Sequence, residues 1–307
     1  MIKDLISEFK ELLKENWPRF KASKFGSIGV IILFMFLFLA ILGPIYVGIM
    51  GPSYNPVSGM DLSLEINPET NSYAWPPSWD HPMGTDSKGS DVFSQFLNGS
   101  YLAFVIGISI AIGAAIFGTI FGLISGYWGG TWKDSLIMRT VDVLFCIPFL
   151  PLLIVISAVI GALKLSVFIV IMIFFSWMGV CRVIRAQTLS LRTRPYVDSA
   201  RVTGASNFRI IFRHIAPNVI PLSFFSLSMI VGGAILAESS LSFLGFGDPT
   251  QMSWGMMMSF CRAQSHIFKA LWWFLPPGLG ITLIATAFYL IGRSLDEIVN
   301  PRLRERK

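Results

Sequence analysis

The most distinctive charged residues of this sequence lie together in a basic island at residues 192–217, between two long apolar runs. A single acid, Asp198, opposes the arginines of this island. An arginine at the centre of a bilayer costs about 2.5–3.5 kcal/mol on insertion scales, so the island must lie outside the lipid. We therefore expect a segment at the membrane surface. Its arginines are Arg192, Arg194, Arg201, Arg209 and Arg213.

The residue types in the island also predict its local structure. Pro195 can begin a short helix, since its missing N–H costs nothing at the first helical position. Gly204 can end that helix, because glycine accepts the left-handed conformation. Ser206 or Asn207 can then cap a second helix. The apolar residues that share one face of this amphipathic second helix are Phe208, Ile211, Phe212 and Ile215.

Two other polar positions stand in or beside apolar runs. Glu238 is the only acid in its run, and an acid in a membrane segment is a functional candidate by default. The run has nearly ended at that point, however, and neighbouring serines can partner the carboxylate, so we favour a structural role. Those serines are Ser239, Ser240 and Ser242. Arg139 and Asp142 lie three residues apart and can pair on one helix face, again as a structural pair.

The residues His81, Asp86 and Asp91 could be read as metal ligands, but capping of turns by aspartate explains them more simply. The sequence has no Gly-Lys dipeptide, so no Walker A loop can cradle a phosphate. It also has no His-Glu-x-x-His pattern and no clustered carboxylates, so an enzyme is poorly supported. The apolar runs hold almost no central charge, which argues against a proton- or sodium-coupled carrier.

The composition is that of a membrane protein. The 307 residues are 53% hydrophobic and 14% charged, with a mean hydropathy of +0.64. Six apolar runs are long enough to cross about 30 Å of hydrocarbon, which predicts an all-α membrane protein with six transmembrane helices. The predicted spans are residues 26–49, 98–126, 138–160, 165–181, 218–240 and 271–292. The other predicted parts are an amphipathic N-terminal helix at 1–25, an extracytoplasmic segment at 50–97, a loop at 182–217 within a five-helix core at 98–292, and a tail at 293–307.

The distribution of basic residues predicts the orientation of the spans. With both termini in the cytoplasm, twenty of the 24 Lys and Arg residues fall in inner segments. This is the bias that the positive-inside rule describes, and the inverted topology would reverse it. A nucleic-acid-binding surface would show no such alternation, so the net charge of +6 does not indicate nucleic acid as a partner.

Two features within the runs predict helix shape and packing. Pro148 and Pro151 should kink the third span, because proline cannot complete the helical hydrogen-bond pattern. Gly118 and Gly122 form a small-xxx-small pair in the second span, which lets two helix backbones approach closely in lipid.

Several motifs in sequence order resemble the permeases of ABC importers. The island reads RPYVDSARVTGAS, and its Asp-Ser-Ala-x-x-x-Gly pattern at 198–204 is similar to the Glu-Ala-Ala-x-x-x-Gly loop of that family. Asp198 stands in place of Glu and Ser199 in place of the first Ala. Further similarities are HPMGTDSKGSD, with Ser90 where Arg is usual, then MRTVDVLFCIP, AESSLSFLGFG and the final Asn300-Pro301-Arg302. The resemblance runs from about His81 to Arg302 and points to the branch that imports dipeptides, oligopeptides or nickel.

The resemblance implies a type I ABC-importer permease architecture that binds no cofactor itself, with ATP and Mg on partner subunits. The implied partners are a homologous permease, two ATP-binding subunits, an extracytoplasmic substrate-binding protein and the membrane lipid. In the family the short helix of the island docks into a groove on an ATPase subunit. The residues implied in this coupling loop are Arg194, Pro195, Tyr196, Val197, Asp198, Ser199, Ala200, Arg201, Val202, Thr203, Gly204, Ala205 and Ser206.

The sequence leaves the cargo and one other class of function open. Peptides are the favoured cargo because the family mainly handles peptides, and nickel or a metal chelate is the alternative. A stand-alone channel or secondary transporter is the competing class of protein. The two classes differ in whether ATPase subunits accompany the chain when it is purified.

Overall fold

The computed structural model describes residues 23–299, and its fold over these residues is all-α with only isolated β-bridges. The predicted amphipathic helix at 1–25 and the end of the predicted tail at 293–307 lie largely outside the described residues. The helices are α2 (Lys24–Met50), α3 (Val92–Tyr127), α4 (Trp132–Phe145), α5 (Phe149–Ile160), α6 (Leu165–Leu191), α7 (Pro195–Val202), α8 (Asn207–Arg209), α9 (Ala216–Phe243), α10 (Trp254–Ala263) and α11 (Leu271–Val299), with a 3-10 turn η1 (Pro52–Tyr54) and a π-helical segment η2 (Ile210–Ile215).

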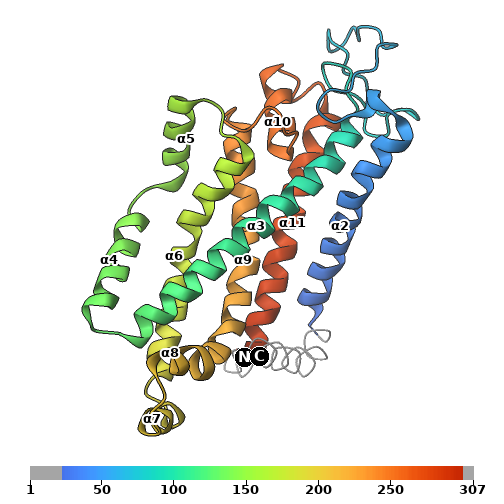
Figure 1. Ribbon diagram of the computed structural model, residues 1–307. Coiled ribbons are helices and arrows are strands. Elements are labelled where there is room, and N and C mark those ends of the chain that lie inside the picture. Colours follow the sequence, from blue (N-terminus) through green and yellow to red (C-terminus); the bar gives the residue numbers. More distant parts are fainter. Residues whose placement is uncertain (1–22, 300–307) are drawn as a thin grey trace.

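The long helices match the predicted spans. Within the described residues, five helices are long and apolar enough to cross a membrane, and they are α2, α3, α6, α9 and α11. Helices α4 and α5 meet the same criterion together, so counting this pair as one span gives the predicted six. The long helices lie side by side, with α7 projecting beyond one end of the bundle and α10 at the other (Figure 1).

The third span is broken rather than kinked. Helices α4 and α5 are bent by 72° at a break of three residues, 146–148. Pro148 explains the place of the break, because a proline disfavours helical conformation in the residue before it and cannot donate a backbone hydrogen bond. Pro151 lies in the first turn of α5, where the missing N–H is harmless, so it causes no second kink.

Helix α6 is longer than the predicted span at 165–181 and continues to Leu191. The prediction ended at the first arginine because it followed hydropathy, whereas the backbone remains helical beyond the apolar run. The two added arginines are paired across helices, Arg182 with Asp142 and Arg185 with Asp134. These pairs offset the cost of carrying charge on a membrane helix.

Helices α3 and α6 approach each other through a row of glycines on α3, as the small-xxx-small pair predicted. A Cβ atom added at Gly118 would lie 2.5 Å from the Cβ of Val180, and one at Gly122 would lie 2.7 Å from the Cβ of Ile184. Gly126 faces Thr188 in the same way. The residue numbers rise together along both helices, so α3 and α6 run parallel, and α4 and α5 form the crossover between them.

The end of the bundle at which α10 lies has a core of large aromatic residues. Trp254 of α10 is 2% exposed and donates from Nε1 to the backbone oxygen of Phe96 in α3 at 3.0 Å. Phe36 of α2 packs edge-on against the same indole, with ring centroids 5.5 Å apart. This cluster fixes α10 against α2 and α3.

Candidate functional site: the inner loop and its anchor

The basic island forms the short helix that the sequence predicted. Helix α7 begins at Pro195, with Arg194 as the N-cap residue in extended conformation. Val197 is fully buried and Ala200 is 9% exposed, and both belong to a core cluster at the ends of α3 and α6. On the outer side, Val202 is 88% exposed. The helix is therefore anchored on one side and presents an apolar side chain on the other.

A glycine turn ends α7. Gly204 has φ of +83°, the left-handed region in which an L side chain is strained, while no heavy atom lies within 4 Å of an added Cβ. The amide of Gly204 donates to the oxygen of Arg201 at 3.1 Å, and the amide of Ala205 donates to the oxygen of Ala200 at 3.0 Å. The backbone conformation, and not a lack of space, is what requires glycine here.

The second helix forms after this turn, as the sequence predicted. The hydroxyl of Ser206 accepts from the amide of Arg209, which confirms Ser206 as the cap. Of the four residues predicted to share a face, Ile211 and Ile215 are buried, whereas Phe208 is 64% exposed and Phe212 is half-buried. The rings of Phe208 and Phe212 nevertheless lie against each other, with centroids 4.4 Å apart, so these two residues share a face.

The rest of the second helix is a stretch of π-helix at Ile210–Ile215. In a π-helix the hydrogen bonds join residues five apart, so Ile210 and Ile215 lie on the same face, and both are fully buried. Pro217 follows in the chain and cannot donate to the oxygen of Arg213, as an α-helix would require. The wider helix passes directly into α9, so the inner loop joins a long spanning helix without a flexible linker.

Polar contacts that sequence reasoning missed tie the loop to the end of α3. The hydroxyl of Tyr127 donates to Oδ1 of Asn207 at 2.7 Å. Nη1 of Arg192 donates to the backbone oxygens of Tyr127 at 3.2 Å and Gly129 at 3.0 Å. The tyrosine was visible in the sequence at the end of the second span, but nothing in its spacing indicated a partner eighty residues away.

The charges on α7 remain available to a partner. Asp198 accepts from Nη1 of Arg201 at 2.9 Å, and both side chains are more than half exposed. Such exposed pairs contribute little to stability, typically about 0–1 kcal/mol, so the pair can exchange its partners at low cost. The loop thus offers an apolar residue and exposed charges of both signs on a surface that its buried side holds in place.

A more buried charge cluster joins α3, α4 and α6 near the loop. Asp134 accepts from Nε of Arg185 at 2.6 Å and from Nη2 of the same arginine at 2.8 Å. Its carboxylate also accepts from the Ser125 hydroxyl at 2.5 Å and from the Gly130 amide at 2.9 Å. A bidentate pair with its remaining lone pairs satisfied fixes three helix ends relative to one another.

The predicted pairing of Arg139 with Asp142 is wrong. Asp142 instead accepts from Nη2 of Arg182, and that guanidinium also lies 4.3 Å from the ring centroid of Phe145. Helical spacing made an i,i+3 pair possible, but a longer side chain from the neighbouring helix α6 reaches the carboxylate. Spacing along one helix cannot reveal a partner on another.

Glu238 has the serine partners that favoured a structural role. It accepts from the hydroxyls of Ser242 at 2.6 Å and Ser239 at 3.4 Å on its own helix, whereas Ser240 bonds to a backbone oxygen instead. A further donor, the hydroxyl of Ser253 at 2.7 Å, comes from the segment before α10. The acid therefore joins α9 to that segment.

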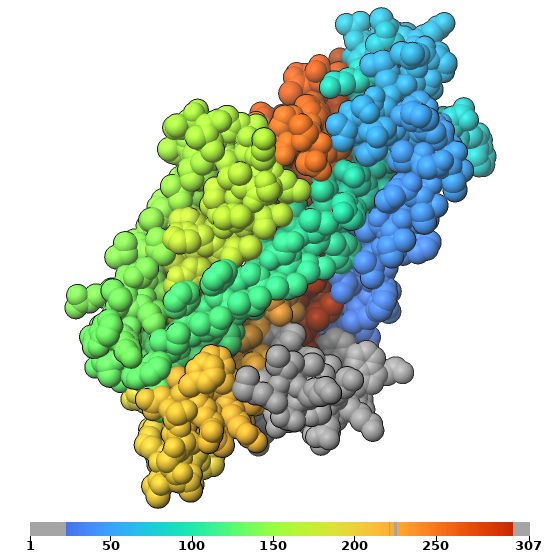
Figure 2. Space-filling model, viewed as in Figure 1, coloured from blue at the N-terminus to red at the C-terminus, as the bar shows by residue number. Residues whose placement is uncertain are grey.

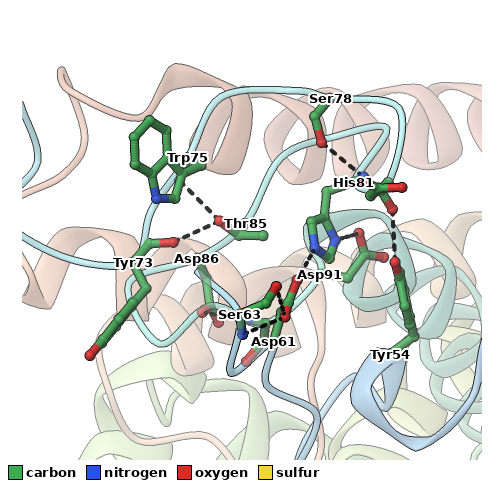
Figure 3. A network of polar contacts seen from close by, with 12 residues as sticks. Tyr54, Asp61, Ser63, Tyr73, Trp75, Ser78, His81, Thr85, Asp86 and Asp91 are labelled. Atoms are coloured by element: carbon green, nitrogen blue, oxygen red, sulfur yellow. Dashed lines mark hydrogen bonds and ion pairs between the residues drawn. The ribbon is translucent and has the colours of Figure 1, made fainter. Parts of the chain in front are cut away.

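The irregular segment at the other end of the bundle is organised around His81 (Figure 3). The imidazole is 5% exposed, with Nδ1 at 3.0 Å from Oδ1 of Asp91 and Nε2 at 3.3 Å from Oδ2 of Asp61. Asp91 also caps α3 by accepting from the Ser94 amide, as the capping interpretation predicted. Asp86 accepts from two backbone amides of its own turn. Within residues 23–299, no group of three or more His, Cys, Asp or Glu side chains has a geometry that could hold a metal ion.

The carboxylates of Asp61 and Asp91 beside His81 should make the stability of this segment depend on pH. The hydrogen bond to Asp91 is the main cause that raises the pKa of His81 above its ordinary 6.5. A raised folded-state pKa gives stabilisation that is complete below 6.5 and is lost as pH rises through the raised value. As the pH rises above 6.5 and through the raised pKa of His81, we expect the backbone amides of residues 78–91 to lose protection from hydrogen exchange, after correction for the intrinsic exchange rates. His81→Gln should abolish the dependence, and equal protection in the wild type at pH values on both sides of this range would contradict it.

The fold and this inner loop define a class of protein, and the comparison with known families agrees. Residues 118–305, more than half of the chain, match the binding-protein-dependent transport system inner membrane component family. The chain belongs to this family and is a multi-pass inner-membrane protein.

Curated relatives are similar over most of the chain. A putative peptide transport system permease protein of Brucella suis is 38% identical over 231 residues, 75% of this chain and 76% of the relative. The dipeptide transport system permease protein of Bacillus subtilis is 34% identical over 293 residues, 95% of this chain and 86% of the relative. The oligopeptide transport system permease protein of the same bacterium is 30% identical over 299 residues, 96% and 91% of the two chains.

Proposed function

We propose that this chain is a permease subunit of an ATP-driven importer of peptides, forming half of the translocation pathway. Its family carries transport that depends on a binding protein. The similar proteins named above are permeases of peptide, dipeptide and oligopeptide systems, and a glutathione transport system permease of Pectobacterium atrosepticum is 37% identical over 229 residues. Peptides or small peptide-like molecules are thus the favoured cargo.

One observation supports coupling to a separate ATPase more than any other. Helix α7 projects from the end of the bundle (Figure 2), yet its buried side belongs to a core cluster that also includes residues of η2 and of the ends of α3, α6 and α9. Close-packed cores transmit displacement instead of absorbing it. A force applied to the exposed Val202 and Tyr196 would therefore move the spanning helices, which is what a coupling element must do.

The proposed mechanism follows from this placement. Two ATPase subunits each hold one coupling loop, one from this chain and one from a homologous permease. When ATP closes the ATPase pair, the two loops approach and the bundle changes from inward-facing to outward-facing. ATP can shift this equilibrium only through contacts that differ between the two states, and α7 carries those contacts. The substrate-binding protein delivers cargo at the opposite end.

The orientation that this mechanism needs is the one that the basic residues favour. The loop at 182–217 carries seven Lys and Arg residues, which the positive-inside rule places in the cytoplasm together with α7. Both termini then lie on the cytoplasmic side. The acidic segment between α2 and α3 lies outside, where a binding protein approaches.

Purification from the native membrane tests the proposal. We expect the chain to come out of mild detergent with its ATPase subunits, whereas a stand-alone channel or secondary transporter would come out alone. Asp198→Lys should lower the recovery of ATPase subunits by about tenfold or more, since it reverses an exposed charge on α7 without removing a buried contact. Glu65→Lys, an equal charge reversal at the opposite end, is the matched control and should leave recovery unchanged. Wild-type chain without any ATPase subunit would contradict the proposal.

A further inference from the structure

One tryptophan of the outer segment between α2 and α3 is fully exposed to solvent. Trp79 is 101% exposed, as much as in an extended peptide, and it sits in a tight turn at residues 78–81. An exposed tryptophan on a loose loop could fold back onto the apolar surface nearby. Trp79 remains exposed because the turn that carries it is held from several sides.

The turn is closed by its own hydrogen bonds. The amide of Ser78 donates to the oxygen of His81 at 2.9 Å, and the amide of His81 donates to Oγ of Ser78 at 3.1 Å. The hydroxyl of Tyr54 donates to the oxygen of Asp80 at 3.1 Å, so η1 holds the other side. The tyrosine ring also stacks on the imidazole of His81, with centroids 5.3 Å apart.

His81 then fastens the turn to the membrane helices. Its ring is held between Asp61 and Asp91, and Asp91 is the N-cap of α3. Asp61 is followed directly by Leu62, which is 87% exposed. Two segments that meet at His81 thus each present one large apolar side chain to water, and the hydrogen bonds around His81 hold both segments in place (Figure 3).

Rigid and exposed aromatic residues are the usual anchors of protein interfaces. Tryptophan is enriched among the few residues that carry most of the binding energy. A residue that is already held in place loses little conformational entropy on binding, which adds to affinity. By holding the turn that carries Trp79, the hydrogen bonds of the buried His81 should lower the entropy that Trp79 loses on binding.

The charge around Trp79 favours a protein partner over the lipid surface. Tryptophans that anchor at membrane interfaces are accompanied by Lys and Arg, which anionic headgroups attract. Here the neighbour is Asp80, and the segment at 50–97 carries six acids against one lysine, Lys88. An acidic surface is repelled by anionic lipid and complements a partner with a basic rim.

We propose that Trp79, supported by Leu62, is the anchor through which the extracytoplasmic substrate-binding protein docks on this subunit. This inference rests on the proposed function, since it names the outer partner's contact surface. The segment that carries the anchor lies before the residues that match the family, 118–305. The segment thus precedes the family's matched core, while the alignments with the dipeptide and oligopeptide permeases, which cover 95% and 96% of this chain, extend across it.

The test measures binding of the substrate-binding protein encoded beside this chain, loaded with a dipeptide, to the complete complex in nanodiscs. We expect Trp79→Ala to weaken the affinity about thirtyfold and Leu62→Ala to weaken it less. Trp79 touches no core, so this variant keeps its fold. Trp132→Ala removes another exposed tryptophan, at the start of α4 on the opposite side, and should bind as the wild type does. Unchanged binding by Trp79→Ala would overturn the inference.

Two further measurements separate the possible failures. As a single substitution, His81→Gln should weaken binding of the substrate-binding protein severalfold. Added to Trp79→Ala, the same substitution should weaken binding little further, because His81 acts by positioning the tryptophan. Brominated lipids should quench wild-type and Trp79→Ala fluorescence to the same extent, and extra quenching in the wild type would place Trp79 in lipid and overturn docking. A wild-type complex that binds no substrate-binding protein would instead count against the proposed function itself.

Discussion

Replacing Gly204 with valine is expected to abolish most peptide uptake while the chain still inserts and assembles. The residue has φ of +83°, and left-handed conformation costs an L residue about 1–2 kcal/mol, more when the side chain is β-branched. The turn that ends α7 would open, and the angle between α7 and α8 would change. We expect uptake to fall at least about tenfold in proteoliposomes while ATP hydrolysis continues without stimulation by the binding protein.

The side chain series at this position separates backbone strain from lack of space. No atom lies within 4 Å of an added Cβ at Gly204, so size alone should not matter. We expect Gly204→Asn to retain most uptake, because asparagine tolerates the left-handed region, and Gly204→Ala to be intermediate.

Gly161 supplies a matched control for the same change. It has φ of +90° and equally open surroundings, but it follows α5 at the other end of the bundle. Gly161→Val should therefore also impose backbone strain at a positive φ, without uncoupling ATP hydrolysis from uptake. Normal uptake by Gly204→Val, or equal loss in both variants, would refute a specific role of this turn in coupling.

Replacing Gly122 with leucine is expected to prevent correct packing of α3 on α6. The added Cβ would lie 2.7 Å from the Cβ of Ile184 and 2.8 Å from the backbone oxygen of Cys181. A backbone atom of a long helix cannot move aside as a side chain end can. Overpacking of this kind costs about 1–3 kcal/mol and here should reach the upper end of that range.

The measurement is thermal unfolding of the purified chain in detergent, read by circular dichroism and size-exclusion chromatography. We expect Gly122→Leu to unfold at a clearly lower temperature or to aggregate, and Gly122→Ala to be less severe. Gly179→Leu is the matched control, since Gly179 is also helical, lies on α6, and has no atom within 4 Å of an added Cβ. Equal stability of the two leucine variants would show that the glycine row does not set the helix separation.

Features that depend on neighbours along the chain could be predicted from the order of the residues. Pro195 and Gly204 delimit a short helix, because the missing N–H of proline and the left-handed freedom of glycine are local properties. Ser206 caps the next helix for a similarly local reason. The long apolar runs identified the spans, since bilayer thickness sets how many apolar residues a helix needs.

Features that depend on contacts between distant segments could not be predicted. Asp142 could have paired with Arg139 by spacing, but a guanidinium from another helix takes the carboxylate. A periodicity of 3.6 residues cannot anticipate the π-helix at Ile210–Ile215, in which Ile210 and Ile215 are both buried. The hydrogen bond from Tyr127 to Asn207 joins segments whose proximity only the packed bundle creates.

The sequence by itself thus determined the membrane class, the spans and the local form of the inner loop, because hydropathy and backbone preference act over a few residues. Only the tertiary structure decided that Val197 and Ala200 are buried in a cluster with residues of α3, α6, η2 and α9 while Val202 faces outward. It alone placed His81 between Asp61 and Asp91, so that Trp79 is held in water. These arrangements depend on which side chains meet across the fold, and that is settled by close packing and by the pairing of buried polar groups.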